Sequence, residues 1–343
     1  MRNPDCGRSS SRPSAWSIAF KGSQTIIARR PSRIHRQQRV LLAALALAFG
    51  SLSLLSPARA TAQAVAVIKS HDIEPFNKAL AGFVSACPDP ITEYNLGGSD
   101  RGKKEIVQKI IAGKPRFVLA IGALAARVAK EEIRNIPVIF VMVPNPRKHS
   151  LEAQNIAGIA LDIPVERQFA TYKSLAPSIR TIGVIYDPEK TGATVAEAGR
   201  VADKLGLKLI ATPVSSHKQV PAALRGMLGK IDALWMVADD TVVTPESFKF
   251  LSLTAFEHNL PLITVSEIFV EVGALASLSP DYGDIGRQAC QLLTEIASGR
   301  LSLAGVNIIF PAKVNLAVNL NTALKIGLTL SPEIMKTASK VYR

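Results

Sequence analysis

The sequence is poor in the residues from which metal and redox sites are built. Only three of its 343 residues are cysteine and five are histidine. Beyond residue 60 the histidines show no i, i+4 pairing and no nearby cysteine pair, so no metal site is expected. No G-x-G-x-x-G follows a strand pattern and no G-x-S-x-G occurs, which argues against a dinucleotide cofactor and a hydrolase nucleophile. We therefore expect no cofactor and no enzyme activity.

The basic character of the chain is concentrated at its start. The formal net charge is +14, and residues 1–60 carry ten Lys/Arg and one acid. The remaining excess is small and forms no basic run. Since no helix-turn-helix, zinc-finger or aromatic RNA-binding pattern occurs either, the sequence does not predict a nucleic-acid partner.

The first sixty residues have the pattern of an export signal. A basic region around Arg29 and Arg30 precedes an apolar run, 40–55, and Pro57 is followed by the small-x-small sequence Ala58–Ala60. The pattern predicts a signal peptide over 1–60, cleavage after Ala60 and a periplasmic protein. An uncleaved membrane anchor is the alternative, but the run is short for a span, which needs about 17–25 residues. No cysteine stands at the cleavage point, so no lipid anchor is expected there.

The exported part contains two cysteines, Cys87 and Cys290. Export permits a disulfide. Two cysteines so far apart in the sequence are nevertheless more often two buried thiols, which is the interpretation that the sequence favours.

Apolar strand patterns alternate with helical patterns along the first half of the exported chain. The apolar runs are continuous, as in parallel strands that are covered on both faces. The predicted strands are 64–69, 91–96, 117–121 and 136–143. The predicted helices are 73–86, 103–112 and 123–132.

The same alternation then begins again. The predicted helices are 164–175, 193–205, 219–228 and 245–258, and the strands are 181–186, 208–214, 233–238 and 260–265. A last strand, 274–278, and helix, 285–298, complete the pattern. Two successive arrays predict two doubly wound α/β lobes with parallel sheets. We expect 61–163 and about 276–300 in the first lobe and 164–275 in the second, and leave 301–343 unassigned.

Two short motifs resemble catalytic sites. The segment 97–104, GGSDRGKK, has the spacing of a phosphate-binding loop, but Lys104 stands where a Ser or Thr hydroxyl is needed for the metal. A glycine-rich turn is the simpler interpretation. Ser70, His71 and Asp72 are the residue types of a hydrolase triad, yet adjacent residues cannot easily point at one another in the required relay. We interpret them as a polar loop.

The best candidates for a functional site are the loops that follow the strands, because open α/β sheets bind ligands at the carboxyl ends of their strands. The opening of a helix at Gly122 would suit an anion such as a carboxylate, and the acids of the second half would suit an amine. The acids before residue 245 could equally cap a helix. The predicted ligand-binding residues are Ser70, His71, Asp72, Gly122, Ala123, Pro144, Asn145, Tyr186, Asp187, Asp239, Asp240, Thr241 and Glu267.

These loops and their surroundings resemble the substrate-binding proteins of ABC transporters that are related to tryptophan- and phenylalanine-binding lipoproteins. The resemblance extends from about 65 to 338 and rests on sequences such as FVLAIGALAA, IPVIFVMVPNP and IGVIYDPEKTGAT. The matching stretches are 67–83, 117–126, 136–146, 155–158, 182–194, 220–243, 273–289 and 319–330.

The resemblance implies a type I periplasmic-binding-protein fold, with two lobes, a hinge of three crossings and a ligand in the cleft. It also implies a membrane permease and a cytoplasmic ATPase as partners, and we expect a monomer. The chain departs from the family pattern at Asn145, usually an acid, at Asp187, usually Asn, and at Gly192–Ala193, usually Asn-Ser. The resemblance implies that the family's Asn-Ser pair helps to hold the polar end of the ligand, so the resemblance alone does not fix an amino acid as the ligand of this chain.

The sequence therefore predicts a periplasmic protein that binds a small polar molecule for an uptake transporter. A sensory protein of the same fold, which presents its ligand-bound state to a membrane receptor, is the alternative. Neighbouring genes for a permease and an ATPase, or for a kinase or cyclase, would distinguish the two.

Overall fold

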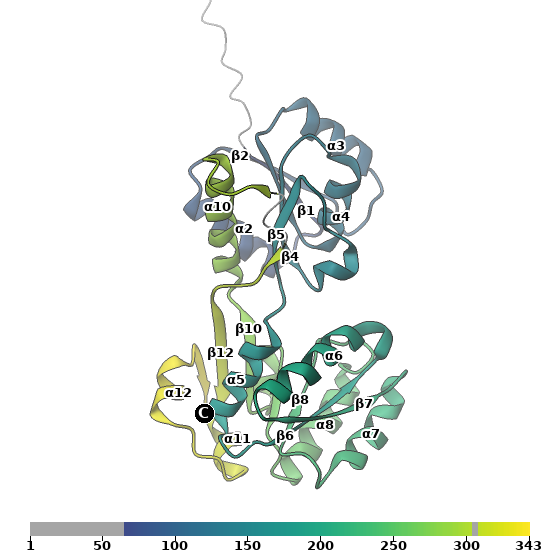
Figure 1. Ribbon diagram of the computed structural model, residues 1–343, viewed down its shortest axis with the longest axis vertical. Coiled ribbons are helices and arrows are strands. Elements are labelled where there is room, and N and C mark those ends of the chain that lie inside the picture. The colour runs from purple at the N-terminus through teal and green to yellow at the C-terminus, as the bar shows by residue number, and fades with distance from the viewer. Residues whose placement is uncertain (1–64, 304–307) are drawn as a thin grey trace, which may run out of the picture. The chain divides into compact units, whose positions relative to one another are not determined.

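The computed structural model describes residues 65–303 and 308–343, which form two α/β lobes (Figure 1). The first lobe is built on a six-stranded parallel sheet with the strand order β11-β5-β4-β3-β1-β2. Its strands are β1 (Val65–Lys69), β2 (Ile91–Asn95), β3 (Phe117–Ile121), β4 (Val138–Val143), β5 (Ile156–Ala160) and β11 (Ile308–Ile309).

The second lobe is built on a seven-stranded sheet with the order β13-β12-β10-β9-β8-β6-β7. All neighbours in it are parallel except β10 and β12. Its strands are β6 (Thr181–Tyr186), β7 (Lys208–Pro213), β8 (Ala233–Trp235), β9 (Leu262–Thr264), β10 (Ala276–Pro280), β12 (Val314–Asn319) and β13 (Lys340–Tyr342).

Helices connect most of the parallel strands. They are α2 (Glu74–Ala86), α3 (Lys103–Ala112), α4 (Ala123–Glu132), α5 (Val165–Leu175), α6 (Pro188–Lys204), α7 (Val220–Met227), α8 (Pro245–Glu257), α9 (Glu267–Glu271), α10 (Tyr282–Ala297), α11 (Leu320–Lys325) and α12 (Pro332–Thr337), with short 3-10 turns η2 (Pro146–His149) and η3 (His217–Gln219). Among the described residues, none of the helices combines the length and the apolar composition that a membrane span needs. The predicted signal peptide, 1–60, lies outside the described residues.

The continuous apolar runs become strands with both faces covered, as predicted. In β1, Val65 and Val67 pack into one buried cluster, while Ala66 and Ile68 pack into another on the opposite face. Successive side chains of a strand point to opposite faces, so an uninterrupted apolar run can be buried only between two layers. The predicted fold class, two doubly wound α/β lobes of the type I periplasmic-binding-protein fold, is confirmed.

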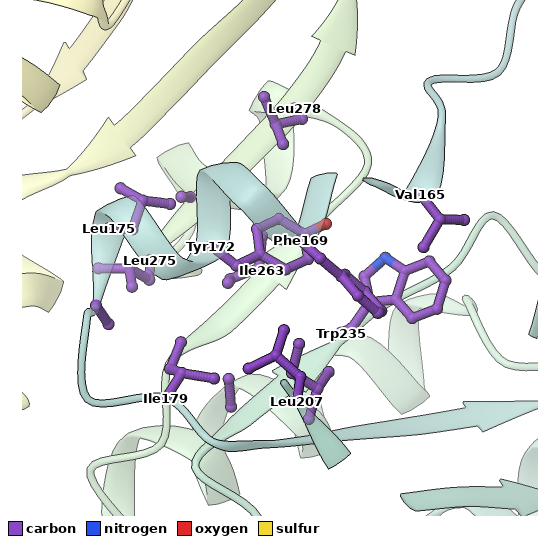
Figure 2. Close-up of a cluster of buried hydrophobic side chains, with 14 of the residues drawn as sticks. Val165, Phe169, Tyr172, Leu175, Ile179, Leu207, Trp235, Ile263, Leu275 and Leu278 are labelled. Carbon is purple, nitrogen blue, oxygen red and sulfur yellow. The ribbon is translucent and has the colours of Figure 1, made fainter. Parts of the chain in front are cut away.

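The core of the second lobe is organised around three aromatic residues (Figure 2). The ring of Phe169 on α5 meets Trp235 on β8 edge to face, with ring centroids 5.1 Å apart. The polar atoms of this core are satisfied by Gln168, whose Oε1 accepts hydrogen bonds from Tyr172 Oη at 3.0 Å and from Trp235 Nε1 at 3.1 Å. Burial raises the pKa of the Tyr172 phenol.

Within the described residues the chain passes between the two sheets three times, as the hinge of the predicted fold requires. The crossings are 161–164, between β5 and α5, 281, between β10 and α10, and 310–313, between β11 and β12. The proposed boundary at about 276 differs from the structure, because β10 pairs with β9 and β12 of the second sheet. Its side chains Ala276 and Leu278 are buried in the core of that lobe.

Helices α2 and α10, which are far apart in the sequence, lie side by side in the first lobe (Figure 1). Glycine allows their backbones to touch: a Cβ on Gly82 would overlap the carbonyl oxygen of Gly283, and one on Gly286 would overlap that of Ala79. One end of the pair is joined by a disulfide between Cys87 and Cys290, whose Cα atoms are 5.6 Å apart. The expectation of two buried thiols is therefore wrong.

Two helix starts in the second lobe differ from those predicted from the sequence. Helix α6 begins at Pro188, five residues before the predicted start, because the Asp187 side chain accepts a hydrogen bond from Glu189 N and caps it. Helix α8 is capped by Thr244, whose hydroxyl accepts from Ser247 N. The residues 239–241 therefore do not cap α8, as one interpretation of the sequence suggested.

Candidate functional site

The predicted site residues follow strands that are neighbours in each sheet. In the first lobe they follow β1, β3 and β4, which are adjacent, and in the second they follow β6, β8 and β9, which are also adjacent. Because the carboxyl ends of neighbouring parallel strands meet at one edge, each lobe brings its own set of loops together. A role for each residue in binding stays a prediction.

In the first lobe, Ser70 and Gly122 form the start of helix α4. The buried Ser70 Oγ accepts a hydrogen bond from Ala125 N at 2.9 Å and satisfies one of the free N–H groups of the helix. Gly122 has a φ of +91°, and a Cβ there would lie 2.6 Å from Ser70 Oγ and 2.7 Å from Phe76. In the described part of the chain, the N–H groups of Ala123 and Leu124 have no hydrogen-bond partner.

Asp72 is held by a buried lysine rather than left free. Lys69, at the end of β1, places its Nζ 3.2 Å from Asp72 Oδ1, 2.6 Å from Glu93 Oε1 and 2.9 Å from Asn77 Oδ1. Burial lowers the pKa of Lys69, but hydrogen bonds to the two acids raise it more, so the net direction is upward. Hydrogen bonds from Asn77 and Lys69 hold the pKa of Asp72 below its ordinary value.

The two catalytic motifs do not assemble into catalytic sites. Asp72 N donates to His71 Nδ1, at 3.1 Å, while the Asp72 carboxylate is engaged elsewhere, so no Ser-His-Asp relay forms. His71 instead packs on Gly98, where a Cβ would lie 2.7 Å from the ring. The lysine of the phosphate-loop-like segment, Lys103, is paired with Glu131 and Glu132 of α4 at 3.0 and 3.3 Å.

The loop after β4 turns sharply at Asn145, which has a φ of +44°. Asn145 N donates to Asp162 Oδ2 at 2.6 Å, so the first hinge crossing holds this loop. Burial raises the pKa of Asp162, although the Asn145 N–H opposes the shift. The preceding Pro144 is exposed.

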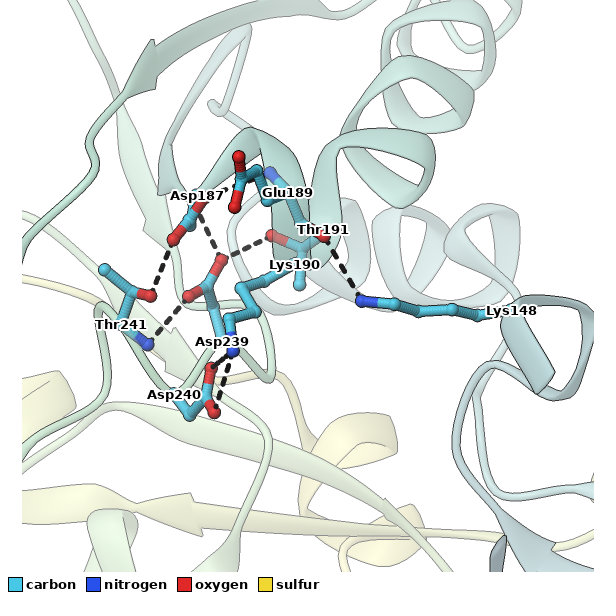
Figure 3. A network of polar contacts seen from close by, with 8 residues as sticks. All are labelled: Lys148, Asp187, Glu189, Lys190, Thr191, Asp239, Asp240 and Thr241. Atoms are coloured by element: carbon cyan, nitrogen blue, oxygen red, sulfur yellow. Dashed lines mark hydrogen bonds and ion pairs between the residues drawn. The ribbon is translucent and has the colours of Figure 1, made fainter. Parts of the chain in front are cut away.

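The second lobe contains a compact polar network around Asp239 (Figure 3). Asp239 is 2% exposed, and its carboxylate accepts hydrogen bonds from Asp187 N at 2.8 Å, Thr191 Oγ1 at 2.6 Å and Thr241 N at 3.0 Å. Thr241 Oγ1 in turn donates to Asp187 Oδ2 at 2.7 Å. This bond and the Glu189 N–H keep the pKa of Asp187 below its ordinary value. Asp239 therefore joins the loops after β6 and β8.

Asp240 differs from its neighbour in being open to solvent. Its side chain is 78% exposed, and its carboxylate lies 3.4 Å from Lys190 Nζ of α6. Lys148 Nζ, from the loop after β4, donates to Glu189 O at 3.2 Å beside this network (Figure 3). Tyr186, at the end of β6, is half-buried against the core of the second lobe.

Glu267 is the first residue of helix α9, and its side chain accepts a hydrogen bond from a residue near the carboxyl end of the chain. Tyr342 Oη on β13 donates to Glu267 Oε1 at 3.0 Å. Glu267 also lines a cavity of about 630 Å³, and is the one predicted site residue to do so. The other lining residues are Lys78, Ala81, Gly82, Ser85, Ser266, Ser279, Pro280, Asp281, Tyr282, Gly283, Arg287 and Asn315.

The family model described as ABC transporter substrate binding protein matches residues 91–342, which is more than half of the chain. The chain belongs to this family. The resemblance drawn from the sequence is thereby confirmed, and the chain is a substrate-binding protein of the ABC type.

Similar proteins agree with this assignment. A tyrosine-binding protein of Clostridioides difficile (strain R20291) is 27% identical over 241 residues, which cover 65% of this chain and 69% of the relative. The ligand-free, open structure of a Clostridium difficile substrate binding protein with adhesive properties has a TM-score of 0.70 at 22% identity, over 81% of this chain and 98% of that one. The structure of a Streptococcus pneumonia ABC domain in complex with L-Trp has a TM-score of 0.55 at 22% sequence identity, over 81% of this chain and 99% of that one. The structural likenesses show the fold.

The polar residues that line the cavity of this substrate-binding protein, apart from Glu267, were not among those predicted from the sequence. Asp281 caps α10 by accepting from Asp284 N at 2.9 Å, and Lys313 Nζ lies 3.1 Å from its other oxygen. Ser279 and Tyr282 flank it at the crossing between β10 and α10. These residues could have been found from the sequence, because they follow the carboxyl end of strand β10 at Pro280, and ligands of open α/β sheets bind at the carboxyl ends of the strands.

We expect the Tyr342 phenol of the substrate-binding protein to lose its proton at a higher pH than an ordinary tyrosine. Burial and the hydrogen bond to Glu267 raise its pKa to about 12, from an ordinary value of 10. The stability that this provides is complete below pH 10 and is lost as the pH rises through 12. The difference in phenolate absorbance between wild type and Tyr342→Phe should give a titration midpoint near pH 12. Glu267→Gln should move this midpoint to lower pH. A midpoint near 10 in wild type would contradict the contact.

Proposed function

We propose that this chain is the exported solute-binding component of an ABC uptake transporter. It binds a small polar molecule between its two lobes and does not change that molecule chemically. The ligand is an amino acid or a related amine or carboxylate. Family membership supports the binding role, and the signal pattern of residues 1–60 supports export. A membrane permease with its cytoplasmic ATPase would receive the ligand, and we propose that the protein acts as a monomer.

The observation that carries the ligand class is the start of helix α4. The N–H groups of Ala123 and Leu124 lie at the N-terminus of α4, which is the positive end of the helix dipole. Neither has a hydrogen-bond partner in the described part of the chain. Ser70 completes the turn, and the absence of a side chain at Gly122 lets Ser70 and Phe76 pack against the start of the helix. This arrangement suits a carboxylate.

The second lobe offers the matching partner for an amine. Asp239 is already engaged by three donors, so the exposed carboxylate of Asp240 is the better acceptor. The relatives that bind tyrosine and L-Trp handle molecules with both groups. We propose a ligand whose carboxylate meets α4 and whose amine meets the loop after β8.

A calorimetric comparison of L-tyrosine with tyramine, which lacks the carboxylate, tests this assignment. Ala123→Pro removes one N–H at the first helical position, where proline fits, so it should weaken L-tyrosine binding about tenfold, the equivalent of roughly 1.4 kcal/mol, and leave tyramine unchanged. Ala123→Gly keeps the N–H and is the matched control. Equal affinity of wild type and Ala123→Pro for L-tyrosine would refute the carboxylate contact, and no binding of either compound would rule out tyrosine-like ligands.

A further inference from the structure

The third hinge crossing, 310–313, is held from both sides by side chains. From α10, Gln288 Nε2 donates to Phe310 O at 3.0 Å, and Gln288 Oε1 accepts from Ala312 N at 3.1 Å. From α5, Arg167 donates through one terminal nitrogen to Pro311 O at 3.3 Å and to Ala312 O at 3.0 Å. The backbone polar groups of this short segment are thus engaged by two different helices.

The two helices belong to different lobes. Helix α10 packs on α2, and its residues Ile285, Ala289 and Cys290 are buried in the first-lobe core. Helix α5 contributes Phe169 and Tyr172 to the second-lobe core. Gln288 therefore fixes the crossing to the first lobe, and Arg167 fixes it to the second.

The second and third crossings are also tied to one another. Asp281 N donates to Lys313 O at 3.1 Å, and Lys313 Nζ lies 3.1 Å from Asp281 Oδ2. A rotation of one lobe relative to the other must be absorbed by a few backbone dihedrals at such crossings. A crossing whose carbonyls and amide are held on both sides restricts which rotations the chain can make.

We propose that Gln288 and Arg167 form a hinge clamp, which acts as a positioning device and restricts the motion of the lobes to a narrow set of orientations. This inference rests on the proposed function in one respect, because the motion that the clamp guides is the closure of the lobes around a ligand. Neither side chain belongs to the predicted ligand-binding loops. Loss of either should therefore widen the distribution of lobe orientations in the ligand-free protein.

The test measures that distribution directly. Spin labels at Lys104→Cys on α3 and Lys249→Cys on α8, both exposed and without side-chain partners in the described residues, report the distance between the lobes by double electron–electron resonance. Gln288→Ala and Arg167→Ala should each broaden the distance distribution at least about twofold. In Gln288→Ala, hydrogen exchange of the 308–314 segment should also rise, because the Ala312 amide loses its acceptor.

Two matched controls separate a clamp from a general loss of stability. Gln291→Ala removes a glutamine one turn along α10 that bonds only within its helix, and Arg200→Ala removes an exposed arginine of α6. Both should leave the distribution unchanged. Melting temperatures of all four variants should stay within about 3 °C of wild type. An unchanged distance distribution in Gln288→Ala and Arg167→Ala would overturn the proposal, whatever ligand the protein binds.

Discussion

Removing the Cys87–Cys290 disulfide should lower the free energy of unfolding by about 2–5 kcal/mol. The bond joins residues 203 positions apart, and a cross-link that closes so long a loop removes much of the entropy of the unfolded chain. It ties the end of α2 to α10, and the backbones of the two helices also touch at Gly82 and Gly283. Both cysteines are buried, so alanine at each position removes one packed sulfur atom in addition to the bond, and reduced wild type keeps both sulfur atoms for comparison.

Urea denaturation of wild type and of the Cys87→Ala/Cys290→Ala double variant measures this effect. The midpoint should fall, and reduced wild type should behave like the double variant. Oxidised wild type and the double variant should have the same first-lobe secondary structure under native conditions. A double variant within about 0.5 kcal/mol of oxidised wild type would show that the bond adds nothing to stability.

Replacing Asp239 by alanine should destabilise the second lobe by about 3 kcal/mol. The substitution removes three hydrogen bonds to a buried carboxylate and leaves the Asp187 N–H without a partner. Bonds to a charged group contribute roughly 1.5–3 kcal/mol each, and a buried donor without an acceptor adds a further cost. The bonds share one side chain, so their contributions do not simply add.

The adjacent residue provides a matched control. Asp240 is 78% exposed and lies 3.4 Å from Lys190, so Asp240→Ala should change the free energy of unfolding by less than about 1 kcal/mol. Chemical denaturation of both variants distinguishes the two roles. If both variants lose the same stability, the network of Figure 3 does not hold the two loops together.

The alternation of strands and helices could be predicted because most elements are apolar on the faces they bury. Strands β3 and β6 and helices α3 and α4 have the predicted bounds. Strand β5 was not predicted, since its sequence, IAGIA, is short and contains Gly158, against which Phe140 packs. Strand β12, VNLAVN, is the antiparallel partner of β10, and no local pattern marks that pairing.

The position of the candidate site could be predicted, but the role of each side chain could not. The loops after neighbouring strands follow from the order of strands in a parallel sheet. Whether an acid is free or engaged depends on partners from elsewhere in the chain: Asp239 is bound by Thr191, 48 residues away, whereas Asp240 points to solvent. The disulfide has the same origin, because Cys87 and Cys290 meet only through the packing of α2 on α10.

The proposed function requires that this protein binds one small polar molecule and leaves it unchanged. Native mass spectrometry after incubation with the small-molecule filtrate of a host extract measures whether such a complex forms. We expect one adduct per chain, whose mass is that of an unmodified amino acid or a related amine or carboxylate. The adduct should be weaker in Ala123→Pro than in Ala123→Gly. The absence of any adduct, or release of a chemically altered molecule, would contradict it.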